Sequence, residues 1–188
     1  VASRMIEAVC DELLRQANAT APAIRGRALL ALANLRGLQG NYKEAVQLYR
    51  NCLAQEENAD LTADSSIRTT IGVRMATASA RQREGKEARK AYRSVLQVAN
   101  LHGSINMEAA SGLALECYAV PEERDEAIQL VERWETHCAR ENCGSALRNF
   151  GMLRLAQGRT ADAEQLLRAG IDLLRDQARE WSPLLPWH

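Results

Sequence analysis

The residues of this chain best suited to metal binding or nucleophilic chemistry are three histidines and five cysteines. Three of them, His137, Cys138 and Cys143, are close in sequence as H-C-x4-C. Zinc sites usually combine one such pair with a second Cys or His pair elsewhere. No second pair is present, and His102 and His188 are remote in sequence. We therefore interpret Cys138 as a buried residue near a helix end and Cys143 as a turn residue, and we expect no metal and no cofactor.

Catalytic motifs with a known mechanism are absent from the sequence. It contains no G-x-S-x-G, no P-loop, no G-x-G-x-x-G and no H-E-x-x-H. The acidic pairs Glu56-Glu57 and Glu122-Glu123 are expected at solvated helix ends, where the second pair suits the dipole of a first helical turn. We expect no catalytic residue and no enzymatic activity. An enzyme or metal protein that uses Cys138 and Cys143 is the least favoured alternative.

The charge balance and the cysteines indicate which kinds of partner and which cellular compartment to expect for this chain. The 188 residues include 24 basic and 24 acidic ones, so the formal net charge is +0. A nucleic-acid binder normally has a basic excess, and a membrane span needs about 18 uninterrupted apolar residues, which are missing. The odd, scattered set of cysteines is not typical of a disulfide framework. We expect a reducing, cytoplasmic location, with a cleaved import peptide as the open alternative.

Apolar residues recur at helical spacing, and glycine, proline and capping residues divide the chain into short helices. Four prolines and 4% aromatic residues favour helix over sheet. We predict an all-α fold in a single domain, 1–180, with Gly85 ending one helix and Pro121 starting another. The predicted elements are an N-terminal helix (4–17), helix pairs at about 23–57, 64–101, 105–139 and 145–178, and a tail, 181–188, expected to cap the last helix or to dock another chain.

The helix pairs resemble one another in sequence. A weak copy of the pattern spans 115–131. The segment 33–49, ANLRGLQGNYKEAVQLY, matches 151–167, GMLRLAQGRTADAEQLL, and the segment 76–92 keeps the two small residues and the aromatic. In these last three, two small residues stand 12 positions apart, which places them on facing helices near the crossing. Successive anchors in the second helices are 43, 39 and 36 residues apart, and such periods are typical of helical solenoids. The predicted packing residues are Ala33, Ala45, Ala76, Ala88, Ala127, Gly151 and Ala163.

This pattern resembles the tetratricopeptide repeat family in a degenerate form with a longer period. Gly151, Gly158, Ala163 and Leu167 match the family motif best, whereas the third pair departs from it at Pro121. The resemblance implies a right-handed α–α superhelix, a TPR-like solenoid of about four helix pairs plus the N-terminal helix. An irregular helical bundle is the alternative. The resemblance also implies a non-catalytic protein–protein interaction module: an adaptor, scaffold or assembly factor.

In this family the first helices of the pairs line a concave groove that binds a peptide or a partner helix. By register, the residues implied for that groove are Arg27, Leu30, Asn34, Val73, Arg74, Thr77, Arg81, Gly112, Glu116, Arg148 and Met152. The four arginines favour an acidic peptide or a C-terminal carboxylate. The alternative is that they pair with local carboxylates such as Glu116.

The clamp of family members that bind chaperone tails is incomplete here, because Asn34 matches but Leu30 stands in place of a lysine. A second hypothesis is that the chain is the partner- or ligand-sensing segment of a larger signalling or transcriptional regulator, which the 43- and 39-residue spacings favour. Homo-oligomer formation stays open.

Overall fold

The structure is a computed structural model that describes residues 2–16, 22–58, 65–98, 103–140 and 143–181. These ranges are helical, with no strand among them. None of their helices is both long enough and apolar enough to span a membrane. The chain divides into two compact units, Val1–Val98 and Ala99–His188. The single domain predicted over 1–180 stays a prediction.

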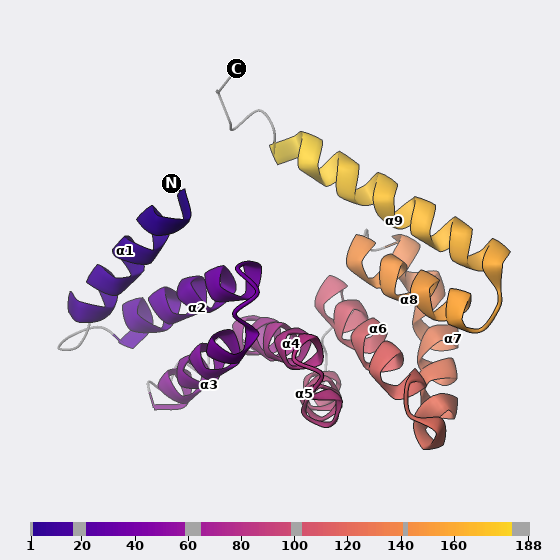
Figure 1. Cartoon of the computed structure of the whole chain (residues 1–188), viewed down its shortest axis with the longest axis horizontal. Helices are drawn as coiled ribbons and strands as arrows, with labels where there is room; N and C mark the ends of the chain where they lie inside the picture. The colour runs from indigo at the N-terminus through magenta and orange to yellow at the C-terminus, as the bar shows by residue number, and fades with distance from the viewer. Residues whose placement is uncertain (1, 17–21, 59–64, 99–102, 141–142, 182–188) are drawn as a thin grey trace. The chain divides into compact units, whose positions relative to one another are not determined.

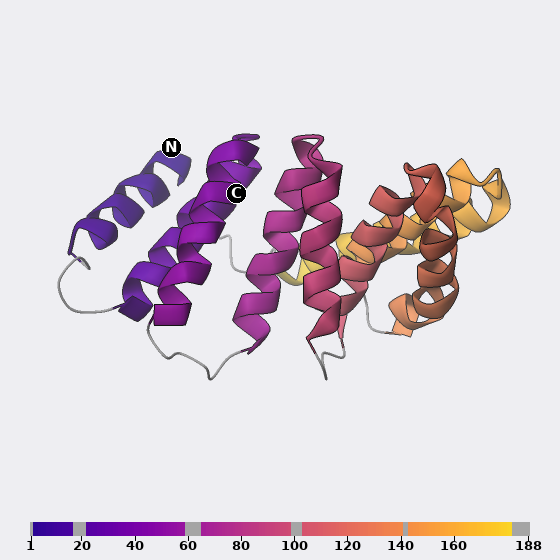
Figure 2. The same cartoon turned by 90° about the horizontal axis from the view of Figure 1, so that it is seen from below.

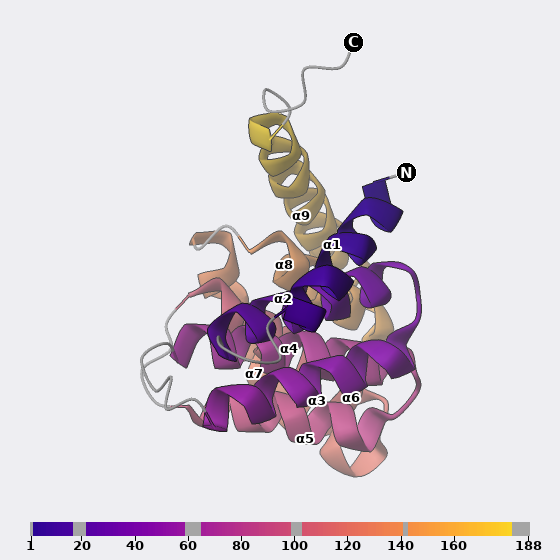
Figure 3. The same cartoon turned by 90° about the vertical axis from the view of Figure 1, so that its left-hand side faces the viewer.

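The described residues of the first unit form five helices: α1 (Ala2–Gln16), α2 (Pro22–Leu38), α3 (Tyr42–Asn58), α4 (Ser65–Arg81) and α5 (Gly85–Gln97). The pairs α2–α3 and α4–α5 are helical hairpins, and α1 packs against α2 (Figure 1). Figure 2 shows the two hairpins as antiparallel pairs in violet and magenta. In Figure 3, α2 and α4 lie on one side of this unit and α3 and α5 on the other. The helices therefore form a zigzag row.

The core of the first unit follows from the helical spacing of its apolar residues. In α5, Ala88, Tyr92 and Val95 recur at i, i+4 and i+7, and all three are buried. In α3, Ala45 and Tyr49 are buried in a cluster that also holds Leu29, Ala33, Val46, Cys52, Ile71 and Ala78. A smaller cluster, Cys10, Leu32 and Leu35, joins α1 to α2.

The second unit contains α6 (Ser104–Tyr118), the 3-10 turn η1 (Pro121–Glu123), α7 (Arg124–Arg140), α8 (Gly144–Ala156) and α9 (Thr160–Trp181). The hairpins are α6–α7 and α8–α9, and α8 packs on the first hairpin mainly through α6 (Figure 1). Because α6 contacts both α7 and α8, nine of its residues are buried. Phe150, the single phenylalanine of the chain, is fully buried on α8.

The turns inside three hairpins share one hydrogen-bond pattern, a Schellman motif. The amides of Asn41, Glu84 and Arg159 each donate to a carbonyl five residues earlier, at Arg36, Ser79 and Arg154. The left-handed residue of each turn is Gly40 (φ 81°), Arg83 (φ 65°) and Gly158 (φ 76°).

The prediction that Gly85 ends the fourth helix was therefore wrong. That helix ends at Arg81, and Gly85 is the first residue of α5. Arg83 takes the left-handed position because the two turn hydrogen bonds require it there, whatever its side chain. Two other boundaries also differ: Pro121 starts a 3-10 turn rather than α7, and α9 continues to Trp181. The rest of the predicted tail, 182–188, lies outside the described residues.

Candidate functional site

A hollow of about 540 Å³ lies in the first unit between α2 and α4, and residues of α3 also line it. We call it the α2–α4 groove. Its lining residues come from all three helices: Asn34, Gly37, Leu38, Tyr42, Tyr49, Arg74, Thr77, Ala78 and Arg81. Four of them, Asn34, Arg74, Thr77 and Arg81, are residues that the sequence placed in a groove.

The repeat explains why these four side chains meet. Asn34 and Thr77 are 43 residues apart, as are Leu38 and Arg81, so each pair occupies the same register on successive first helices. Positions 34 and 38 of α2, and 74, 77 and 81 of α4, lie on one face of each helix. That face turns away from the buried anchors Ala33 and Ala76.

Two tyrosines of the second helices fix polar groups of the first helices. The Tyr49 hydroxyl donates to Asn34 Oδ1 at 2.8 Å, and the Tyr92 hydroxyl lies 3.0 Å from Thr77 Oγ1. Burial raises the pKa of Tyr49, and the nearby positive charge of Arg74 partly opposes this rise. Tyr49 is therefore a neutral donor at neutral pH, which leaves the Asn34 amide N–H groups available to the groove.

The α2–α4 groove is electropositive. Arg74 and Arg81 are both exposed at its edge, and no carboxylate is among its lining residues. Within the part of the chain that the structure describes, neither arginine forms an ion pair. In this unit, therefore, the alternative that the groove arginines are neutralised by local carboxylates does not hold for Arg74 or Arg81.

Other predicted residues of the first unit lie outside this groove. Arg27 is exposed and lines a separate hollow between α1 and α2, beside Met5, Ile6 and Val9. Leu30 is half-buried and packs on the core. Val73 is only 2% exposed, so its side chain belongs to the interior and is not accessible to a partner. It precedes Arg74 by one residue, which turns it about 100° around the helix.

The predicted residues of the second unit lie on α6 and α8. Gly112 is buried and Glu116 is half-buried. Arg148 is exposed, with Nε and NH2 at 3.4 and 3.2 Å from Asn149 Oδ1. Met152 is 52% exposed. Asn149 donates in turn to Ser111 Oγ at 3.1 Å, joining α8 to α6.

The residues predicted to pack the repeats are all buried, with no more than 1% exposure for the six alanines. A Cβ on Gly151 would come within 2.8 Å of Leu167 Cγ and 3.3 Å of the Ala163 carbonyl oxygen. α8 and α9 thus approach closely where both carry small residues.

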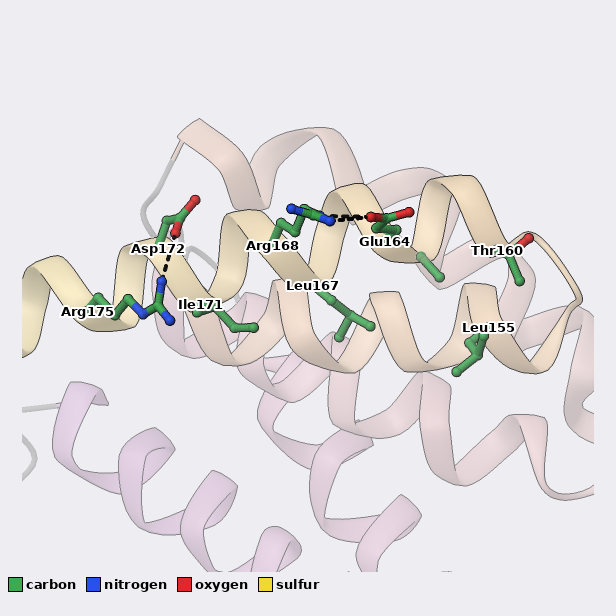
Figure 4. Close-up of a pocket in the computed structure, with 9 residues that line it drawn as sticks. Leu155, Thr160, Glu164, Leu167, Arg168, Ile171, Asp172 and Arg175 are labelled. Atoms are coloured by element: carbon green, nitrogen blue, oxygen red, sulfur yellow. Dashed lines mark hydrogen bonds and ion pairs between the residues drawn. The ribbon is translucent and has the colours of Figure 1, made fainter.

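A second surface with exposed apolar residues lies on α8 and α9 (Figure 4). Leu155 and Ile171 are 50% and 49% exposed there, flanked by the ion pairs Arg168–Glu164 at 2.6 Å and Arg175–Asp172 at 3.9 Å. Leu167 and Ile171 correspond in register to Tyr49 and Leu53, which pack in a cluster with residues of α4. The predicted cap for this surface, residues 182–188, lies outside the described part of the chain.

Of the H-C-x4-C residues singled out in the sequence, the structure describes the side chains of His137 and Cys143, and the side chain of Cys138 lies outside the described part. Cys143 is buried, its Sγ donates to the Ser104 carbonyl at 3.5 Å, and burial raises its pKa. His137 contacts the Trp134 ring at 6.1 Å between centroids. Among the described residues one group of metal-ligand types lies together: Cys117, Glu123 and Glu126, with ligand atoms within 4.8 Å. The buried Cys117 thiol donates a hydrogen bond to Glu123 Oε2 at 3.3 Å, so this polar group has a partner within the protein.

Sequence reasoning missed several lining residues of the α2–α4 groove. Tyr42 and Tyr49 of α3 were not among the predicted groove residues, although both line the groove. Leu38, which is 87% exposed, was also missed. Leu38 could have been found from the sequence, because it precedes the predicted groove residue Arg81 by the 43-residue repeat spacing.

Comparison with known proteins identifies the fold. No protein-family model and no curated protein matches the sequence. Among solved structures, the chain is similar to MamA (TM-score 0.56, 16% identity, 93% of this chain and 89% of that one) and to BtubC from P. vanneervenii (0.65, 14%, 99% and 76%). It is also similar to the TPR-like repeats of a putative kinesin light chain from Podosopora anserina (0.64, 19%, 95% and 88%). The chain therefore has an all-α, TPR-like helical-repeat fold, which confirms the predicted fold class.

Proposed function

We propose that this chain is a non-catalytic protein–protein interaction module, and that its α2–α4 groove binds an acidic peptide segment. The observation that carries the proposal is the pair Arg74 and Arg81, exposed at one groove with no carboxylate among its lining residues. Guanidinium groups bind carboxylates through paired, charge-assisted hydrogen bonds.

The remaining lining residues suit a peptide. The Asn34 amide can donate to a backbone carbonyl, because its oxygen is already held by Tyr49. Leu38 and Tyr42 offer apolar surface beside the charges. The TPR-like fold supports this function, since stacked helix pairs form extended binding surfaces. A peptide with acidic residues near an apolar side chain fits this combination.

The test is a display library of random peptides selected on the full chain, followed by affinity measurement of the selected peptides. We expect enrichment of Asp and Glu. The double variant Arg74→Glu, Arg81→Glu should weaken binding by about tenfold or more, which corresponds to at least about 1.4 kcal/mol. Added salt should also weaken it.

The matched control is Lys43→Glu, Lys86→Glu, which changes the net charge equally at two exposed lysines outside the groove. Selected peptides without acidic residues would contradict the proposal. Equal loss of affinity in the two double variants would also contradict it, because that result would reflect net charge alone.

A further inference from the structure

A second hollow in the first unit, of about 400 Å³, lies on the opposite side of α4, between α3 and α5. We call it the α3–α5 hollow. Its residues come from α3 (Arg50, Leu53), from α4 (Met75, Ser79) and from α5 (Lys90, Val95), among others. It shares no lining residue with the α2–α4 groove.

The repeat shows why this space is open. Arg36, Ser79 and Arg154 occupy the same position in the three Schellman turns. Arg36 reaches Glu7 of the preceding helix α1 and Glu44 of α3, the latter at 2.9 Å. Arg154 likewise reaches Glu135 of the preceding helix α7. In both places a long arginine fills the space beside its own helix.

In the α4–α5 pair the arginine is missing while its surroundings remain. Ser79 is 3% exposed and too short to cross the space. Glu87, the counterpart of Glu44 by the 43-residue period, lines the hollow. Glu135, which pairs with Arg154, stands eight residues after the anchor alanine of its helix. The residue at the same position in α3 is Leu53, so an apolar side chain stands where the glutamate would be. The arginine–glutamate network is thus replaced by an open space with an apolar wall.

The charges at this hollow favour an anion. Arg50, Arg68 and Lys90 are all exposed and line it from three different helices, against the single carboxylate of Glu87. Within the described residues, Arg50 and Lys90 form no ion pair. The wall between them is apolar, formed by Leu53, Met75 and Val95. An apolar wall with a few convergent charged groups is the usual composition of a small-molecule site.

We propose that the α3–α5 hollow binds a small amphipathic carboxylate, with its apolar chain on Leu53, Met75 and Val95 and its carboxylate between Arg50 and Lys90. Its volume is near the lower end of small-molecule sites, about 300–1,000 Å³. A medium-length aliphatic chain therefore fits better than a folded partner. The site is separate from the peptide groove, and neither proposal depends on the other.

The test is titration of the full chain with decanoate, followed by calorimetry and by the NMR signals of the Met75 and Val95 methyl groups. Decyltrimethylammonium, with the same chain and the opposite charge, is the ligand control. We expect saturable binding of decanoate, shifts of both methyl signals and no comparable binding of the cation.

Two variants and one matched control locate the site. Lys90→Glu should weaken decanoate binding about tenfold or more, and Lys86→Glu, an equal charge change on α5 outside the hollow, should alter it less than about twofold. Ser79→Arg introduces the arginine that the other two turns carry at this position, where Glu87 can pair with it. The new side chain should fill the hollow and abolish decanoate binding. It should not lower the free energy of unfolding.

The proposal is overturned if decanoate shows no saturable binding or if the ammonium compound binds equally well. It is also overturned if Lys86→Glu weakens binding as much as Lys90→Glu. Undiminished binding to a folded Ser79→Arg variant has the same consequence. Should that variant not fold, the two lysine variants decide the question, since both residues are exposed. Loss of peptide binding in the groove variants leaves these expectations unchanged.

Discussion

Arg154 of α8 and Glu135 of α7 form an ion pair across two helices, with Arg154 Nε 3.1 Å from Glu135 Oε2 and Arg154 only 6% exposed. Arg154 NH1 also donates to Gln157 at 3.0 Å. Arg36 makes the corresponding contacts with Glu7 of α1 and with Gln39. α1 therefore contacts α2 through the same kind of arginine–glutamate pair by which α7 contacts α8. The N-terminal helix thus takes the place of a second helix in the repeat pattern.

Replacing Arg154 should destabilise the protein. We expect Arg154→Met to lower the free energy of unfolding by about 2 kcal/mol, because the largely buried Glu135 carboxylate loses its charged donor. Urea unfolding measures this. The control is Arg168→Met, which removes an exposed pair with Glu164 and should cost less than about 0.5 kcal/mol. Similar losses in both variants would contradict the structural role of Arg154.

Arg83→Gly should stabilise the protein. Arg83 has a φ of 65°, where a side chain costs about 1–2 kcal/mol and glycine costs little. Part of this gain is offset by the greater freedom of glycine in the unfolded chain, so we expect a net gain of about 0.5–1 kcal/mol. The reverse change, Gly158→Ala at the matching turn position, should destabilise. A lower midpoint of urea unfolding for Arg83→Gly would disprove the strain at this residue.

Adding one methyl group should have opposite effects at two helical glycines. Gly151→Ala should destabilise by about 1–3 kcal/mol, because its Cβ would meet Leu167 and the Ala163 carbonyl. Gly26→Ala should stabilise by up to about 1 kcal/mol through helix propensity, since nothing lies within 4 Å of its Cβ. Thermal and urea unfolding of the two variants check this contrast, and equal effects would argue against close packing of α8 on α9.

Stability should fall in alkaline solution. Burial raises the pKa of Cys143 above its ordinary value of 9.0 and that of Tyr49 above 10.0. Above these values the unfolded chain loses protons that the folded chain keeps, so the free energy of unfolding decreases as the pH rises. The contribution is fully present below pH 9.0.

The measurement is urea unfolding at a series of pH values from neutral upward. Cys143→Ala should reduce the fall in the free energy of unfolding that begins near pH 9.0. Tyr49→Phe should reduce the further fall that begins near pH 10.0. The two variants should leave the pH dependence near neutrality unchanged. A wild-type curve that is flat through both values would show that these groups titrate alike in the folded and unfolded chain.

The helices and their pairing could be predicted because they depend on short-range signals. Apolar spacing, turn glycines and the 12-residue offset of small residues all act within one hairpin. The turn at Arg83 could not be predicted in this way. Gly85 was the expected signal, but the left-handed position was decided by hydrogen bonds to Ser79 and Ala80. Those bonds depend on where α4 ends, which packing sets.

Four of the residues predicted for a binding groove line one hollow of the first unit. Asn34, Arg74, Thr77 and Arg81 are brought together because one helical face repeats with the period of the chain. Val73 was wrongly included because a one-residue difference in register separates an exposed face from the core. Residue type could not decide between these faces, since valine is compatible with both.

The sequence alone determined that the chain forms short amphipathic helices in pairs, because that information repeats locally in residue type and spacing. Only the tertiary structure decided where space stays open between the pairs. The α3–α5 hollow exists because Leu53, Ser79 and Glu87 meet where arginine–glutamate pairs stand elsewhere. Such a space depends on the summed volumes of side chains from three helices, and no single stretch of sequence contains that sum.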